Sequence, residues 1–214
     1  MSTVTGGPEV AIPTAFGTFR GRAWTVSESA VEHLSISAPG NGDPGEVPLV
    51  RLHSECLTGD VFGSHRCDCG EQLEQALELI QEQGGLVLYL RGQEGRGIGL
   101  ANKLRAYALQ ENGADTVEAN EQLGLPVDAR EYQVAAEILE ELGMTRIRLL
   151  SNNPLKRDHL ERYGIAVVSM VPSQIPSRLE NRRYLETKRD RLNHQLSHLQ
   201  EHLDKPQEKI VQQS

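Results

Sequence analysis

The sequence has only three cysteines among its 214 residues, and its N-terminus shows no pattern of a secretory signal. An odd number of cysteines without such a signal argues against the disulfide framework that is typical of small secreted domains. Long apolar runs are missing as well, since none approaches the roughly 20 residues that a membrane-spanning helix needs. We therefore expect a cytoplasmic protein that has no membrane partner.

Positive charge is also in short supply: 22 Lys and Arg residues face 30 Asp and Glu, which gives a formal net charge of −8. General nucleic-acid binders usually carry a basic excess, so we expect no nucleic-acid partner. The two common nucleotide fingerprints are absent, because no Gly-Lys-Ser/Thr ends a P-loop and no G-x-G-x-x-G occurs. Arginines nevertheless recur in or near the motifs described below, which favours one localised anion site: Arg51, Arg66, Arg91, Arg96, Arg105 and Arg130.

All three cysteines fall within one short segment, as Cys56, Cys67 and Cys69. Thiolates are ligands that zinc prefers, and three protein ligands with water in the fourth position is the usual arrangement of catalytic zinc. No fourth cysteine exists to close a structural tetrahedron. The spacing alone leaves two alternatives open: three reduced cysteines without a metal, or a structural site closed by His53 or His65.

Hydrophobic spacing predicts an α/β fold: a mixed sheet with flanking helices, a β-rich N-terminal portion and a C-terminal helix. We expect a single domain over residues 1–204 and a disordered tail over 205–214. Strands are expected at 18–20, 23–26, 47–53, 86–90, 147–150 and 165–171. Helices are expected at 70–83, at 98–111, from 128 to 142, and after the turn 151–154 as far as Gly164.

Four details of these helices are testable. The helix at 70–83 should bury one stripe, and the helix at 98–111 should bury another made of Ala101, Leu104, Ala108 and Leu109. Asp128 is a candidate N-cap of the third helix, and Gly143 stands where its C-terminal cap should be.

The segment 179–203 is polar and favours a helix. Its leucines recur at intervals of four and three, a narrow stripe suited to a partner helix: Leu192, Leu196, Leu199 and Leu203. We therefore expect a homodimer. A second stripe is suited either to a solvated face or to adventitious metal, and comprises His194, His198 and His202.

A glycine-rich segment, R-G-Q-E-G-R-G-I-G-L at 91–100, lies between a predicted strand and a predicted helix. Glycines let a backbone approach a ligand closely, and helix N-termini favour anions. Glu94 and Arg96 lie between these glycines. The carboxylate of Glu94 could accept hydrogen bonds from the donors of a guanine edge, and the guanidinium of Arg96 could bind a phosphate. The alternative is a generic glycine-rich turn.

Five motifs in order closely resemble those of the GTP cyclohydrolase II family: R-L-H-S-E-C-L-T-G-D (51–60), R-C-D-C-G (66–70), Q-E-G-R (93–96), D-T-V-E-A-N (115–120) and S-N-N-P (151–154). The resemblance runs from about Arg51 to Lys188. It implies hydrolysis of GTP to 2,5-diamino-6-(5-phospho-ribosylamino)pyrimidin-4(3H)-one, formate and pyrophosphate, the first step of riboflavin biosynthesis. It also implies a homodimer.

The resemblance further implies roles for individual residues. Cys56, Cys67 and Cys69 would bind one Zn²⁺ per chain, which lowers the pKa of bound water to about 7, and Mg²⁺ would accompany the GTP phosphates. Asp128 would be the proton acceptor, and Tyr107 would lie near the zinc-bound water. Arg130 would act on the α-phosphate, either as a nucleophile or electrostatically, since an arginine pKa above roughly 12 makes it an awkward nucleophile. GTP would contact Arg51, Leu52, His53, Ser54, Glu55, Gln72, Glu94, Gly95, Arg96, Thr116, Ser151 and Lys156.

Three departures from the family pattern are visible, and one of them is Gly92, which looks like one extra residue relative to some members. Ser151 replaces a frequent threonine and keeps the hydroxyl, whereas Leu155 replaces a frequent lysine and removes a charge beside Lys156. Other functions stay open, namely a homologue of a secondary pathway that releases a formylated intermediate, or a non-catalytic zinc module. A zinc nucleobase deaminase also matches His53-Ser54-Glu55, but its Pro-Cys-x-x-Cys motif is missing.

Overall fold

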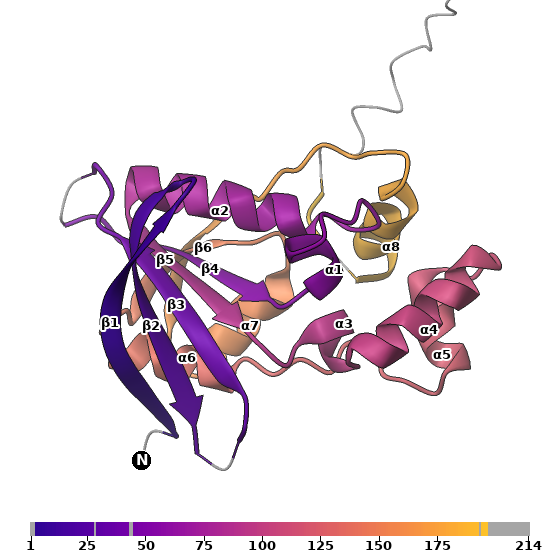
Figure 1. The fold of residues 1–214 in the computed structure, drawn as a ribbon, viewed down its shortest axis with the longest axis horizontal. Helices are drawn as coiled ribbons and strands as arrows, with labels where there is room; N and C mark the ends of the chain where they lie inside the picture. Colours follow the sequence, from indigo (N-terminus) through magenta and orange to yellow (C-terminus); the bar gives the residue numbers. More distant parts are fainter. Residues whose placement is uncertain (1–2, 28, 43–44, 193, 197–214) are drawn as a thin grey trace, which may run out of the picture.

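The computed structural model describes residues 3–27, 29–42, 45–192 and 194–196. One seven-stranded sheet runs through these residues in the order β1-β2-β3-β5-β4-β6-β7 (Figure 1). Its antiparallel part contains β1 (Val4–Thr14), β2 (Gly17–Val26) and β3 (Glu32–Ala38), and β3 also pairs antiparallel with β5. Its parallel part contains β5 (Gly85–Leu90), β4 (Leu49–Ser54), β6 (Arg146–Leu150) and β7 (Ala166–Val171). The predicted mixed α/β fold is confirmed.

Helices cover both faces of the sheet. Alternate side chains of β5 point to opposite faces of the sheet, as expected for a pleated strand. Leu86 and Leu88 pack in one core cluster with Leu139 of α6, and Val87 packs in another with Ile80 of α2. Figure 1 shows α2 on one side of the sheet and α6 and α7 on the other. The helices are α1 (Leu57–Asp60), α2 (Cys69–Gln83), α3 (Glu94–Gly97), α4 (Leu100–Glu111), α5 (Thr116–Gln122), α6 (Gln133–Glu141), α7 (Pro154–Arg162) and α8 (Arg182–Leu192).

The parallel strands determine where the site forms. β4 ends at Ser54, β5 at Leu90 and β6 at Leu150, and these strands are neighbours in the sheet. The carboxyl ends of parallel neighbours meet at one edge, which is where open α/β sheets bind ligands. The cysteine segment, the glycine-rich segment and the S-N-N-P turn all follow these ends directly.

Two helical predictions were wrong. Asp128 does not cap α6, which begins at Gln133, because its carboxylate instead accepts from the backbone N–H of Arg130 at 3.1 Å and from the guanidinium Nε of Arg130 at 2.9 Å. The predicted buried face of α4 is turned outward, and Leu104 is 51% exposed. This helix contacts α3 and α5 rather than the sheet, so the face it buries is the one that carries Lys103.

A further helix was not predicted, whereas one predicted helix cap is confirmed. The structure has a helix, α5, that spacing did not predict, and Asp115 begins it with a capping box that includes Glu118. Gly143 follows the C-terminus of α6 with a φ of +70°, as its predicted capping role requires. None of the helices in the described part of the chain is long and apolar enough to span a membrane.

The C-terminal helix is confirmed, but it is shorter than expected. It ends at Leu192, and residues 194–196 are not helical. Leu196 turns inward and packs against Leu185, and His194 lines a pocket, so neither belongs to a regular surface stripe. The rest of both predicted stripes and the predicted tail lie outside the described residues: Leu199, Leu203, His198, His202 and 205–214.

Candidate metal centre and anion pocket

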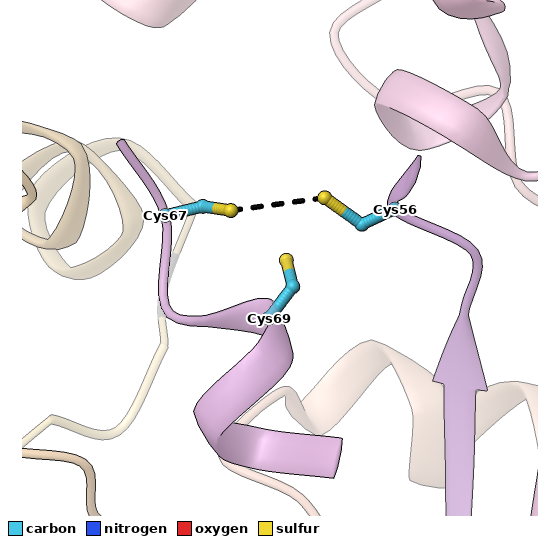
Figure 2. Close-up of side chains that lie close together, drawn as sticks. All are labelled: Cys56, Cys67 and Cys69. Atoms are coloured by element: carbon cyan, nitrogen blue, oxygen red, sulfur yellow. Dashed lines mark hydrogen bonds between the residues drawn. The ribbon is translucent and has the colours of Figure 1, made fainter. Parts of the chain in front are cut away.

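The three cysteines converge although they come from two separate elements. Cys56 follows β4 and begins α1, whereas Cys67 and Cys69 stand at the start of α2. Their Sγ atoms all lie within 4.8 Å of one another, and those of Cys56 and Cys67 are 3.7 Å apart (Figure 2). Three sulfurs at tetrahedral zinc, with bonds of about 2.3 Å, would be about 3.8 Å apart.

A glycine leaves the space that this cluster needs. A Cβ atom on Gly59 would lie 2.9 Å from the Sγ of Cys67 and 3.2 Å from the Sγ of Cys56. Within the described part of the chain, this candidate metal cluster contains cysteines alone. The donor set and its spacing therefore fit one zinc ion, and the alternative of a site closed by His53 or His65 has no support.

A buried lysine contacts the thiolate centre. The Nζ of Lys103 donates to the Sγ of Cys56 at 3.1 Å, to the hydroxyl of Thr58 at 2.8 Å and to the carboxylate of Glu94 at 2.7 Å. Hydrogen bonds from Cys67 and Cys69, together with the Lys103 ammonium, hold the pKa of the Cys56 thiol far below its usual range. Hydrogen bonds to Cys56, together with burial, raise the pKa of the Cys67 and Cys69 thiols, so Cys56 is the sulfur at which negative charge is stabilised.

Asp60 braces the backbone of the first cysteine. Its carboxylate accepts from the backbone N–H of Cys56 at 2.9 Å, from the Tyr89 hydroxyl at 2.8 Å and, in the appropriate tautomer, from the Nε2 of His53 at 3.0 Å. Burial lowers the pKa of His53. The histidine is therefore a structural partner of Asp60 and leaves the metal ligands to the cysteines.

One pocket connects the thiolates with a group of cations. Burial, and then the neighbouring Arg51 and Arg130, lower the pKa of Lys156 well below its ordinary value. Both terminal nitrogens of Arg96 are buried without a hydrogen-bond partner in the described structure. The Nζ of Lys156 donates to the carbonyl of Leu52 at 2.7 Å and lies 5.7 Å from the centre of the Tyr132 ring, so both groups are neutral. Such an excess of positive charge suits an anionic ligand.

Most of the predicted site residues line this pocket. They are Arg51, His53, Ser54, Glu55, Cys56, Cys67, Cys69, Gln72, Gly95, Arg96, Tyr107, Thr116, Arg130, Ser151 and Lys156. Three others stand behind its lining. Leu52 is part of the core, Glu94 accepts from Lys103 and from the backbone N–H of Leu57, and Asp128 is paired with Arg130.

The pocket also contains residues that the sequence analysis did not select. On α4 they stand at positions 103, 106 and 110, which share one face of the helix with the predicted Tyr107. No local pattern distinguished the residues from the C-terminal segment. The additional lining residues are Gln93, Ile98, Lys103, Ala106, Gln110, Asn120, Asn152, Asn153, Tyr184, Lys188 and His194.

Fold and site together define an α/β protein with a thiolate metal centre that opens onto a cationic pocket. The family model of GTP cyclohydrolase II matches residues 6–172, and the chain belongs to that family.

Curated relatives agree with this assignment. The chain is 54% identical over 187 residues to "Riboflavin biosynthesis protein RibBA" of Nocardia farcinica, covering 87% of this chain and 45% of that protein. It is 55% identical over 187 residues to the protein of the same name from Salinispora tropica, covering 87% and 46%. The chain thus spans about half the length of the curated relatives it matches. Among solved structures, RibBX, a two-domain 3,4-dihydroxy-2-butanone 4-phosphate synthase from A. baumannii, aligns with a TM-score of 0.44 and 20% identity, covering 80% of this chain and 41% of that one.

Proposed function

We propose that this chain hydrolyses GTP to 2,5-diamino-6-(5-phospho-ribosylamino)pyrimidin-4(3H)-one, formate and pyrophosphate, the first step of riboflavin biosynthesis. The observation that carries the proposal is that the thiolate centre and the unpaired cations line the same pocket. A purine ring and a polyphosphate chain on one substrate would use both. Family membership supports the same reaction.

The ring-opening end of the pocket is the thiolate centre. Cys56, Cys67 and Cys69 would hold zinc, which supplies Lewis-acid activation of water when it is bound. Lys103 offsets the negative charge of the thiolates. Burial raises the pKa of Tyr107, so its phenol stays protonated and can donate a hydrogen bond beside the centre.

The phosphate end is arranged around Arg130. Although burial opposes it, Asp128 raises the pKa of Arg130, and the guanidinium also donates to the Ser54 hydroxyl at 3.3 Å. A protonated guanidinium has no lone pair to attack phosphorus. We therefore assign Arg130 an electrostatic role against the charge that develops as pyrophosphate leaves, and Asp128 the role of orienting it. Mg²⁺ is the natural counter-ion of the phosphates.

Product analysis tests the proposal. The zinc-loaded chain should release formate and pyrophosphate from GTP, and mass spectrometry should show the deformylated product. Cys67→Ser should lose zinc and formate release together, whereas His65→Ala, an exposed change in the same loop, should keep both. A product that retains the formyl group would instead support the secondary-pathway alternative. Formate release at the parent rate by a zinc-free variant would refute the metal assignment.

We also propose a homodimer, formed by a single domain over residues 1–204 in the cytoplasm. Free cysteines are usual in a reducing compartment. Large apolar side chains are exposed on the loop after α1, where Phe62 is 75% exposed, and on α4 at Leu104. Exposed apolar groups of this kind favour an interface. Because Leu196 packs inward, these residues replace the leucine stripe as the proposed contact.

A further inference from the structure

The C-terminal segment crosses the pocket. We call residues 181–192 and 194–196 the strap; they lie beyond the end of the family match at residue 172. At one end Arg183 donates to the carbonyl of Gly113 at 2.6 Å, and α8 contacts α5. At the other end the backbone N–H of Gln195 donates to the carbonyl of Asn152 at 3.0 Å, in the turn after β6. The strap thus joins two walls of the pocket.

An ion pair joins the middle of the strap to the metal loop, which is the segment that carries Cys67 and Cys69. The Nζ of Lys188 lies 2.7 Å from the carboxylate of Asp68, and both side chains are buried. Asp68 stands between Cys67 and Cys69, two of the three candidate ligands. A shift of the strap would therefore move Asp68, and with it the loop that carries Cys67 and Cys69.

The strap presents polar groups to the cationic part of the pocket. Tyr184, Lys188 and His194 all line it, and the Arg96 guanidinium lies 5.8 Å from the centre of the Tyr184 ring. Burial, and then Lys188, Arg96, Lys156 and Arg130, lower the pKa of His194 to about 2. The imidazole is therefore neutral at physiological pH, and it stands among four cations where it can donate an N–H to an anion.

We propose that the strap closes the pocket over the phosphates of the nucleotide, with His194 as a further phosphate-contacting side chain and Lys188 as the positioning residue that holds the strap to the metal loop. This inference rests on the proposed function, because it takes a nucleoside triphosphate as the ligand. A strap that served packing alone would have no reason to carry a neutral imidazole into a group of cations.

Calorimetry on the full chain tests the two residues with matched controls. His194→Ala and Lys188→Gln should each weaken binding of a non-hydrolysable GTP analogue about tenfold, the usual effect of losing one hydrogen bond to a charged group. The control changes next to each are Gln195→Ala, at an exposed position, and Arg189→Gln, at a half-buried one, and both should stay within about twofold. Lys188→Arg keeps the charge and should bind more tightly than Lys188→Gln. Parent-like affinity in His194→Ala, which breaks no ion pair, would overturn the proposal.

Limited proteolysis tests closure itself. Arg191, which is exposed, and Arg189, which is half-buried, are trypsin sites on the strap. The analogue should slow cleavage at both in the parent and much less in Lys188→Gln. Identical cleavage with and without the analogue would overturn closure.

Inorganic tripolyphosphate separates this inference from the proposed function. If GTP is not hydrolysed but the parent binds tripolyphosphate about tenfold more tightly than His194→Ala does, the strap stands and the reaction assignment fails. If GTP is hydrolysed but both proteins bind tripolyphosphate equally, the reaction stands and the strap fails.

Discussion

The lysine beside the thiolates offers the sharpest test of how the metal centre is built. Lys103→Met removes an ammonium that contacts Cys56, Thr58 and Glu94 and keeps a side chain of similar length. Although burial opposes it, Glu94 and Cys56 raise the pKa of Lys103, so the substitution deletes a full positive charge.

The structure sets the size of the expected effect. Lys103 and Glu94 are 8% and 7% exposed, and removing one partner of a buried pair costs about 3–5 kcal/mol. Glu94 keeps two donors, the backbone N–H of Leu57 at 2.7 Å and that of Gly95 at 3.2 Å, so we expect the lower end, about 3 kcal/mol. Loss of the contact to Cys56 should also weaken zinc binding about 10- to 100-fold, as is usual for groups that support metal ligands.

Two assays separate the two effects. Denaturant unfolding of the zinc-free protein measures stability, and competition with a chromophoric chelator measures zinc affinity. The double variant Glu94→Gln/Lys103→Met leaves no unpaired charge, so it should regain most of the stability but not the zinc affinity. Arg105→Gln, an exposed loss of charge on the same helix, is the control for both measurements. Parent-like zinc affinity in Lys103→Met would refute the reasoning.

Three other changes test separate parts of the site. Arg130→Ala should abolish pyrophosphate release, and release at the parent rate would show that the electrostatic role is wrong. Gly59→Ala should lower zinc affinity at least tenfold, roughly the effect of disturbing a ligand's support, because its Cβ would lie 2.9 Å from the Sγ of Cys67. The control is Gly63→Ala, whose Cβ would have no atom within 4 Å, so this variant should lose only stability. Light scattering should show a dimer for the full chain and also for a chain cut after Thr187. The variant Leu104→Lys should be a monomer. A monomeric parent protein would exclude the dimer.

The sequence predicted those elements whose signals are local. Strands β4 to β7 were predicted to within about two residues of their bounds. Each is a short run rich in Leu, Ile or Val that is followed by glycine, proline or a polar turn. Helix α2 was recognised by an apolar stripe that does face the sheet, with Ala76 and Ile80 buried. The cysteine cluster was predicted because all its members lie in one segment.

The errors share a cause, which is contacts that only the folded chain makes. The apolar side of α4 was assigned to the core, but this helix leaves the sheet and turns Lys103 and Tyr107 toward the pocket. Likewise, neither Lys188 nor His194 carries a local signal, because what defines them is a partner or a pocket more than 40 residues away: Lys188 and Asp68 are separated by 120 positions. Hydrophobic periodicity does not predict contacts between residues so far apart in the sequence.

The charge of the pocket shows why net charge misleads about ligands. The chain carries −8 overall, yet three cations of the site have a carboxylate partner and three have none in the described structure. Lys103, Arg130 and Lys188 are paired with acidic residues that stand behind the pocket lining. Arg51, Arg96 and Lys156 meet only neutral groups or nothing, so their charge is left for the ligand. Acidic residues placed elsewhere on the surface cannot cancel this field at short range, because water and salt screen charges beyond about 10 Å. The pocket is therefore prepared for a polyphosphate inside an acidic protein.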